Sequence, residues 1–355
     1  MPPGEGERSG DERLRVVVVG AGVFGRNHLR VYRELERSGT AVELAGVVDP
    51  SPPAREWVAS EYGIPAFASI EDCMRDARAK LRRVQAASVC VPTVEHARTA
   101  RLLMDCGIDL LIEKPIASSL AEADAIVRAA TEHGRIVQVG HLERFNPAVH
   151  AVRALMNSPM FFEVHRLSVF TPRSLDVDVV LDLMIHDLDI VLSLVGAPVR
   201  EVRAVGLPVL SKKVDIANVR LEFENGCVAN FTASRVSTER VRKMRFFQPH
   251  QYLSLDFARQ DLLMIDVTAA AGLDLAQLAA MSGSGGHPSA GMSLRKIPVE
   301  AGEPLRLEIE AFLNAVRQRT KPEVTVEEGR AALALALEIN AAVESHARRT
   351  GLISH

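Results

Sequence analysis

One glycine-rich turn constrains this chain more than any other feature of its sequence. The apolar run at residues 14–19 leads directly into Gly20-Ala21-Gly22-Val23-Phe24-Gly25, and a second apolar run at 44–48 ends at Asp49. The helical pattern between the two runs includes His28, Leu29, Val31, Tyr32 and Leu35. This order of strand, glycine turn, helix, strand and acid predicts a βαβ unit that binds a dinucleotide.

The three glycines meet separate needs of such a site. Gly20 allows a tight turn, Gly22 lets backbone N–H groups approach a pyrophosphate, and Gly25 lets the helix pack close to the strand. Val23 and Phe24 begin the helix, whose N-terminal end favours phosphate through its partial positive charge. We therefore expect all five residues to contact the cofactor. The alternative is a glycine turn without a ligand, since such turns are common.

Asp49 stands where a dinucleotide site needs a ribose ligand, after the second strand. Its carboxylate is expected to accept hydrogen bonds from the ribose hydroxyls and to repel a 2′-phosphate, which favours NAD over NADP. The alternative is an acid that caps a helix beginning after Pro50 and Ser51. Arg55 lies near enough in sequence to leave NADP open as a second cofactor.

Length and composition narrow the class of protein. The 355 residues suffice for about two domains, and 47% hydrophobic with 25% charged residues is ordinary for a globular protein. The net charge of −3 and the lack of a basic block argue against a nucleic-acid partner. No apolar run approaches the ~18–20 residues of a transmembrane helix, so no membrane segment is expected.

Cysteine usage and the N-terminus suggest a compartment. The four cysteines show neither a CxxC pair nor the spacing of a zinc site, which predicts reduced thiols and no metal: Cys73, Cys90, Cys106 and Cys227. Residues 1–12 are rich in proline, glycine and charge and contain no hydrophobic signal region. They predict a disordered leader rather than an export signal, and hence a cytoplasmic protein.

The first half of the chain alternates between strands and helices, which predicts a doubly wound parallel sheet of the Rossmann type over residues 13–140. Ligands of such sheets bind at the carboxyl ends of the strands. Strands are expected at 14–19, 43–48, 86–91, 109–113 and 135–139, and helices at 24–37, 53–62, 70–76, 95–106 and 119–133. Pro92, Thr93, Glu113 and Lys114 follow or end such strands, so they should line the same crevice as the glycine turn.

The second half, residues 141–355, follows a different pattern. Alternating runs with short turns, such as Glu224-Asn225-Gly226, predict a separate α+β substrate domain with a mostly antiparallel sheet. Residues 279–291 are expected to form a flexible loop. Helices are expected at 147–157, 178–194, 304–319 and 326–349, and strands at 161–170, 199–207, 217–223, 227–234, 241–247, 251–257 and 262–267. The C-terminal helices could pack back on the first domain.

Glu113-Lys114-Pro115 follows a buried strand and so places an ammonium group at the ligand edge of the sheet. Few structural roles need a lysine there, although a surface salt bridge is an alternative. Asp182 and His186 lie four residues apart on an expected helix and therefore share one face. A carboxylate can orient or charge the imidazole for proton transfer. The alternatives are a buried core histidine and a metal site, for which no third ligand is evident.

Residues 140–147 join the two halves after the strand at 135–139. His141, Arg144 and Asn146 offer polar groups for a hydroxylated or anionic substrate. The alternative is a domain junction held by its own hydrogen bonds.

Together these motifs resemble the glucose-fructose oxidoreductase/inositol dehydrogenase/MocA family over nearly the whole chain. The resemblance rests on the glycine turn, Asp49, Val91-Pro92-Thr93 with His96, Glu113-Lys114-Pro115, the Asp182/His186 pair and the helix containing Glu308–Phe312. It implies NAD(P)-dependent oxidation or reduction of sugars, inositols and related alcohols. It also implies cofactor contacts by His96 and Glu113, a cis Lys114–Pro115 bond, and dimers or tetramers joined through the open sheet.

A finer resemblance involves residues 140–147, 176–194 and 242–248 with Tyr252, which look like the branch that includes UDP-N-acetylglucosamine 3-dehydrogenases. That branch oxidises the sugar 3-hydroxyl to a ketone for amino-sugar and lipid A synthesis. A UDP-sugar needs cationic partners for its diphosphate, and Arg144, Arg173 and Arg235 are the candidates.

The mechanism expected from the resemblance uses Lys114, Asp182 and His186 in one crevice. His186 would remove the hydroxyl proton, because imidazole titrates nearest to neutral pH. Lys114 would stabilise the developing alkoxide, and Asp182 would bind a neighbouring hydroxyl or orient the site. The alternatives are an inositol or free-sugar dehydrogenase of the same family and a non-catalytic NAD-binding sensor or scaffold.

Overall fold

The computed structural model describes the chain except for residues 1–12, 81, 172–176, 269–271, 273–291 and 352–355. The expected leader, the loop at 279–291 and Arg173 therefore lie outside, or almost wholly outside, the described residues. The chain divides into two compact units. Unit 1 comprises Met1–Gly140 and Leu305–Arg330, and unit 2 comprises His141–Pro304 and Ala331–His355. Among the described residues, no helix is both long and apolar enough to cross a bilayer.

Unit 1 contains the parallel sheet that the sequence predicts, with the strand order β3-β2-β1-β4-β5-β6. This is the order of a dinucleotide-binding Rossmann fold. Its strands are β1 (Leu14–Val19), β2 (Val42–Val48), β3 (Ala66–Phe67), β4 (Ala86–Val89), β5 (Asp109–Glu113) and β6 (Val137–Gly140). Its helices are α1 (Val23–Arg37), α2 (Pro52–Tyr62), α3 (Ile70–Ala79), α4 (His96–Asp105) and α5 (Leu120–Glu132). The sequence pattern misses β3, because a strand of two residues shows no alternation.

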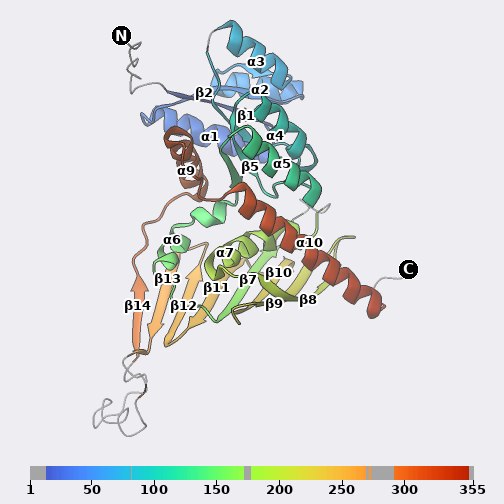
Figure 1. Cartoon of the computed structure of the whole chain (residues 1–355), viewed down its shortest axis with the longest axis vertical. Helices are drawn as coiled ribbons and strands as arrows, with labels where there is room; N and C mark the ends of the chain where they lie inside the picture. Colours follow the sequence, from blue (N-terminus) through green and yellow to red (C-terminus); the bar gives the residue numbers. More distant parts are fainter. Residues whose placement is uncertain (1–12, 81, 172–176, 269–271, 273–291, 352–355) are drawn as a thin grey trace. The chain divides into compact units, whose positions relative to one another are not determined.

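The C-terminal helices complete unit 1. Helix α9 (Pro304–Gln318) buries Ile309 and Phe312 in the same core as Leu29 of α1, and the two helices lie close together in Figure 1. Helix α10 (Val326–Arg349) starts beside β6, where an added Cβ on Gly329 would lie 2.5 Å from Val139. Its first residues belong to unit 1, and it continues into unit 2.

Unit 2 contains an eight-stranded sheet in the order β14-β13-β12-β11-β7-β10-β9-β8. The neighbouring strands are antiparallel, as predicted, apart from the central pair β7–β10, which is parallel. The strands are β7 (Phe161–Val169), β8 (Val199–Leu207), β9 (Ile216–Phe223), β10 (Val228–Ser237), β11 (Val241–Gln248), β12 (Gln251–Asp256), β13 (Asp261–Asp266) and β14 (Ser293–Ile297). The exposed edge strand β14 was not predicted.

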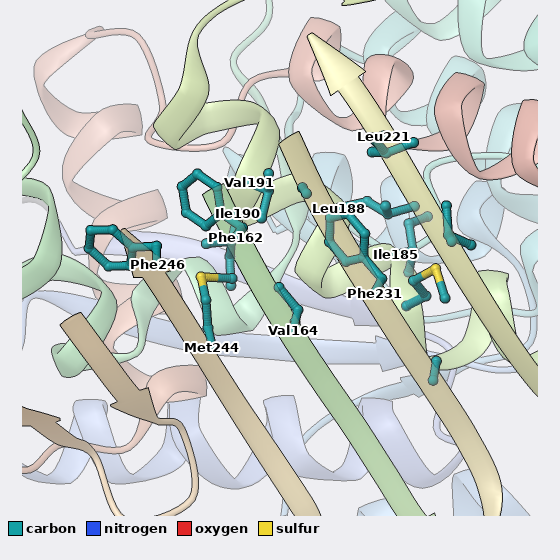
Figure 2. Close-up of a cluster of buried hydrophobic side chains, with 14 of the residues drawn as sticks. Phe162, Val164, Ile185, Leu188, Ile190, Val191, Leu221, Phe231, Met244 and Phe246 are labelled. Carbon is teal, nitrogen blue, oxygen red and sulfur yellow. The ribbon is translucent and has the colours of Figure 1, made fainter. Parts of the chain in front are cut away.

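Helices cover one face of this sheet and form the core of unit 2. The helical segments are a 3₁₀ turn η2 (Leu142–Phe145), α6 (Pro147–Arg153), a π-helical turn η3 (Val180–Met184) and α7 (Ile185–Val195). Figure 1 shows α6 and α7 on the same face. Figure 2 shows sheet residues such as Phe162 and Phe231 packing beneath Ile185 and Leu188 of α7, all of them buried. Successive side chains of a strand point to opposite faces of the sheet. The residues directly before and after Phe162 and Phe231 therefore point to the face that these helices do not cover.

Candidate active site

The glycine turn of unit 1 has the geometry that its sequence predicts. Gly20 has φ of +96°, and a Cβ there would lie 2.5 Å from the carbonyl oxygen of Cys90. A Cβ on Gly25 would collide with the carbonyl oxygen of Gly20. By contrast, a Cβ on Gly22 would meet no atom within 4 Å. Gly20 and Gly25 are therefore required by the fold, whereas Gly22 borders open space that a phosphate group can approach.

The start of α1 suits an anion. Gly22 makes no side-chain cap, and the first turn carries no acidic residue, so the helix dipole is not offset locally. Val23 and Phe24 are exposed beside it. These observations fit a bound dinucleotide, with its pyrophosphate held by the turn.

Asp49 faces this turn from the carboxyl end of β2. Its Oδ2 accepts a hydrogen bond from the N–H of Ala21 at 2.7 Å, and its Oδ1 accepts one from Ser51 at 2.8 Å. A carboxylate has about four acceptor positions, so it retains capacity for ribose hydroxyls. Arg55 donates to the carbonyl oxygens of Asp49 and Pro50, both at 2.8 Å. Its guanidinium group is therefore engaged by this loop.

The residues directly before and after Lys114 each contact a buried histidine, and Pro115 contacts His96. His96 of α4 lies 3.0 Å from the carbonyl oxygens of both Val91 and Pro115, and burial lowers its pKa although these carbonyl groups act in the opposite direction. The predicted cis peptide bond between Lys114 and Pro115 is confirmed. His96 thus joins two strand-end loops through their backbones. Both nitrogens of its ring contact backbone carbonyl oxygens, and the cofactor contact expected of His96 stays a prediction.

Glu113 is also directed into the protein. The carboxylate Oε1 lies 2.8 Å from Nε2 of His28, a residue of α1 that sequence reasoning did not assign to the site. His28, Glu113 and Glu308 bring potential ligand atoms within 4.8 Å of one another, a combination that could hold a metal ion. Glu113 is therefore an internal partner of His28, and the cofactor contact expected of it stays a prediction. The sequence signal for His28 was its position among the apolar residues on one face of α1.

In unit 2 the structure brings His141 and His186 together. Their ring centroids are 6.2 Å apart in an edge-to-face arrangement, and both residues are buried. Asp182 lies one turn before His186, within the π-helical turn η3. Asp178 begins this turn by accepting hydrogen bonds from Val180 and Leu181.

Buried ion pairs fix the segments that carry the two histidines. Arg144 of η2 binds Asp189 of α7 through Nε and Nη2, at 2.8 and 2.6 Å. Arg166 of β7 binds Asp187 of α7 at 2.7 and 2.8 Å and Glu143 of η2 at 2.9 Å. Breaking a buried pair of this kind typically costs about 3–5 kcal/mol.

Three of the residues predicted for the substrate site have partners within the protein. The guanidinium of Arg144 is committed to Asp189, and Asn146 caps α6 and donates to the carbonyl oxygen of Phe257 at 3.0 Å. Arg235 donates to the carbonyl oxygen of Val177 at 2.6 Å and lies 3.8 Å from Asp215. All three side chains are buried and have partners within the protein, and their contact with the substrate stays a prediction.

Comparisons with known proteins agree with this fold. Residues 14–141 match the oxidoreductase family with an NAD-binding Rossmann fold, and residues 148–248 match the GFO/IDH/MocA C-terminal domain. A relative from Acidithiobacillus ferrooxidans, described as UDP-N-acetylglucosamine 3-dehydrogenase, is 36% identical over 95% of this chain and 99% of its own. The scyllo-inositol 2-dehydrogenase (NAD(+)) of Bacillus subtilis is 27% identical over 64% of this chain and 69% of its own.

Solved structures extend the agreement. The structure of the dehydrogenase GnnA from Acidithiobacillus ferrooxidans gives a TM-score of 0.81 at 34% identity, covering 94% of this chain and 98% of that one. The WlbA dehydrogenase from Bordetella pertussis, in complex with NADH and UDP-GlcNAcA, gives 0.73 at 18% identity over 94% and 97%, which supports the fold alone. The chain belongs to the GFO/IDH/MocA family of oxidoreductases. It is an NAD-dependent dehydrogenase.

A pair of glycine variants separates folding from cofactor binding. Gly22→Ala should fold with an unchanged melting temperature yet lose NADH affinity by at least about tenfold, because the methyl group enters the space for the pyrophosphate. Gly25→Ala should lower the melting temperature, since its methyl group collides with backbone. Thermal melting and NADH titration measure both effects, and a Gly22→Ala variant with normal affinity would contradict the assignment.

Asp49→Asn tests the preference for NAD. The amide oxygen can still accept from Ala21, but the negative charge that repels a 2′-phosphate is lost. Because like charges in contact cost on the order of kcal/mol, the ratio of kcat/KM for NAD to that for NADP should fall by about tenfold or more. The steady-state rates with each cofactor measure this ratio. An unchanged ratio would show that Asp49 does not select the cofactor.

Proposed function

We propose that this protein oxidises the 3-hydroxyl group of UDP-N-acetylglucosamine to a ketone, with NAD as the acceptor. The observation that carries the proposal is the 36% identity to the UDP-N-acetylglucosamine 3-dehydrogenase of Acidithiobacillus ferrooxidans, which extends over nearly the full length of both chains. The ketone would be the substrate of an aminotransferase in amino-sugar synthesis. A cytoplasmic location is part of the proposal and is supported by four free cysteines.

The proposed chemistry assigns roles to Lys114, Asp182 and His186. NAD, when bound, supplies the acceptor for the hydride that leaves the alcohol carbon. His186 removes the proton of the hydroxyl group, because its imidazole is a suitable general base at neutral pH. Lys114 donates a hydrogen bond to the same oxygen and stabilises the negative charge that develops on it. Asp182 accepts a hydrogen bond from a neighbouring hydroxyl group or orients the site.

The buried ion pairs of unit 2 support the role of His186. A general base must be held within hydrogen-bond reach of the proton that it removes. Asp187 and Asp189 follow it within three residues and are both bound to arginine. The ring of His141 packs edge-on against it, so we propose that His141 limits its orientation. The three arginines predicted for the diphosphate stay predictions: Arg144, Arg173 and Arg235.

Lys114→Ala is the direct test of the proposed function. The variant should retain NADH affinity but lose turnover of UDP-N-acetylglucosamine by about 100-fold or more, because stabilisation of developing charge is lost. Lys80→Ala removes an exposed lysine paired with Asp76 and is the matched control. Cofactor absorbance with a panel of UDP-sugars, free sugars and inositols identifies the substrate. Full activity of Lys114→Ala would disprove the assignment of Lys114, and turnover of inositol alone would disprove the substrate.

We also propose that the open face of the unit 2 sheet joins two copies of the chain. An apolar row crosses six neighbouring strands in register on this face: Val228, Phe161, Phe247, Tyr252, Ile265 and Leu294. The rings of Phe161, Phe247 and Tyr252 contact one another at centroid distances of 5.7 and 5.0 Å. Phe247 and Leu294 are exposed. Contiguous apolar surface of this kind commonly marks an interface between proteins.

Phe247→Asp should convert the oligomer to a monomer, since a charge at the centre of the row would have to be buried without a partner. Phe247→Leu keeps the apolar character and should preserve the assembly. Light scattering coupled to size-exclusion chromatography measures the mass of each variant. Equal masses for the two variants would exclude this face as the contact.

A further inference from the structure

The side chain that precedes Lys114 is tied to the helix that begins at the glycine turn. Nε2 of His28 lies 2.8 Å from Oε1 of Glu113, and both residues belong to unit 1. A carboxylate only accepts hydrogen bonds, so Nε2 of the imidazole must carry the proton and donate it. His28 is fully buried and Glu113 nearly so. A hydrogen bond to a buried charged group is stronger than one in water, so this contact fixes the end of β5 firmly.

The other ring nitrogen of His28 is held as well. Nδ1 lies 3.1 Å from Oγ of Ser88, and that hydroxyl lies 2.8 Å from the hydroxyl of Tyr32. Burial raises the pKa of Tyr32, so its phenol stays protonated and can donate into this chain of contacts. The imidazole ring of His28 is thus hydrogen-bonded through both nitrogens and cannot rotate without losing a buried hydrogen bond.

Glu308 of α9 adds a second carboxylate to the same buried place. Its carboxylate lies within 4.8 Å of the ligand atoms of His28 and Glu113. Two buried carboxylates this close repel each other unless a proton or a cation lies between them. The Nε2–H of His28 is the donor that faces Glu113 in this cluster. Gly140 leaves room for the arrangement, because a Cβ there would lie 3.2 Å from the carboxyl group of Glu113.

We propose that His28 is a positioning residue for Lys114. Its hydrogen bond to Glu113 fixes the strand end that presents the lysine, and it does so from the helix whose first turn holds the cofactor. His96 fixes the other side through the carbonyl oxygen of Pro115. The inference rests on the proposed function, in which Lys114 acts on the reacting hydroxyl group. It assigns to His28 an effect on the chemical step rather than on cofactor binding.

Two substitutions at His28 separate its hydrogen bond from its volume. His28→Gln retains an N–H donor at about the reach of Nε2, whereas His28→Leu fills the space without a donor. Tyr32→Phe is the matched control, because it removes a buried hydroxyl from the same helix and the same chain of contacts but does not touch Glu113. Thermal melting establishes that each variant is folded.

Cofactor affinity can be measured with the natural tryptophan. Trp57 is the only tryptophan of the chain, and the guanidinium of Arg26 stacks on it at 4.1 Å while also donating to the carbonyl oxygen of Ala21 in the glycine turn. Energy transfer from Trp57 to NADH therefore reports binding at this turn. The measured quantities are the NADH Kd, the KM for the sugar and kcat.

His28→Leu should lower kcat by roughly 10- to 100-fold, because a small displacement of a catalytic group has an effect of this size. Its NADH Kd should stay within about threefold of the parent value. His28→Gln should recover most of the lost kcat, and Tyr32→Phe should lower the melting temperature with kcat within about twofold. A folded His28→Leu enzyme with normal kcat would overturn the inference, as would equal losses of kcat in His28→Leu and His28→Gln.

Two further arms isolate the inference from its alternatives. If Lys114→Ala is fully active, the proposed function fails. If Lys114→Ala is inactive and His28→Leu is normal, the inference alone fails.

A divalent ion held by His28, Glu113 and Glu308 would explain the cluster differently. Dialysis of the purified enzyme against EDTA should leave kcat unchanged, and a loss restored by added zinc or manganese would replace the positioning role with a metal site.

Discussion

The close packing of α1 on the parallel sheet is the constraint on which the rest of unit 1 depends. Gly20 and Gly25 lack a Cβ at the two positions where one would strike backbone. Gly25, His28 and Tyr32 follow one another at helical spacing on the buried face of α1. The absence of side-chain bulk at Gly20 and Gly25 lets α1 pack closely and brings His28 within reach of Glu113 and Ser88. The helix that begins at the glycine turn therefore also holds the residue before Lys114.

In unit 2, buried ion pairs rather than close backbone contacts hold the elements together. The segment after His141 and the helix that carries His186 are joined by two buried ion networks, one direct and one through Arg166 of β7. Burial by itself would raise the pKa of Glu143, but the charge and hydrogen bonds of Arg166 outweigh it and keep the carboxyl group ionised. Charged groups placed this deeply need nearly ideal geometry.

The sequence predicts the fold well because periodicity and turn chemistry are local. The elements of the Rossmann sheet and the cofactor turn follow from apolar runs, glycine positions and the acid after β2. The parallel pairing of β7 with β10 does not, because those strands are distant in the chain and no local signal sets their direction. The same limit applies to side chains at strand ends. Arg144, Asn146 and Glu113 were predicted to face ligands, yet each has a partner within its own unit, and those partners lie 45, 111 and 85 residues away in sequence.

Helix α10 belongs to both units, and this limits how one unit could be exchanged for that of a relative. The chain passes from one unit to the other after Gly140, before Leu305 and after Arg330, and the last of these points falls inside α10. A cofactor-binding half cut at Gly140 would lack α9, whose Ile309 and Phe312 belong to its core. Exchange of substrate specificity between relatives by a single crossover would therefore separate a core from its own helix. Such an exchange needs several junctions together, so point substitutions within unit 2 are the more accessible route to a new substrate.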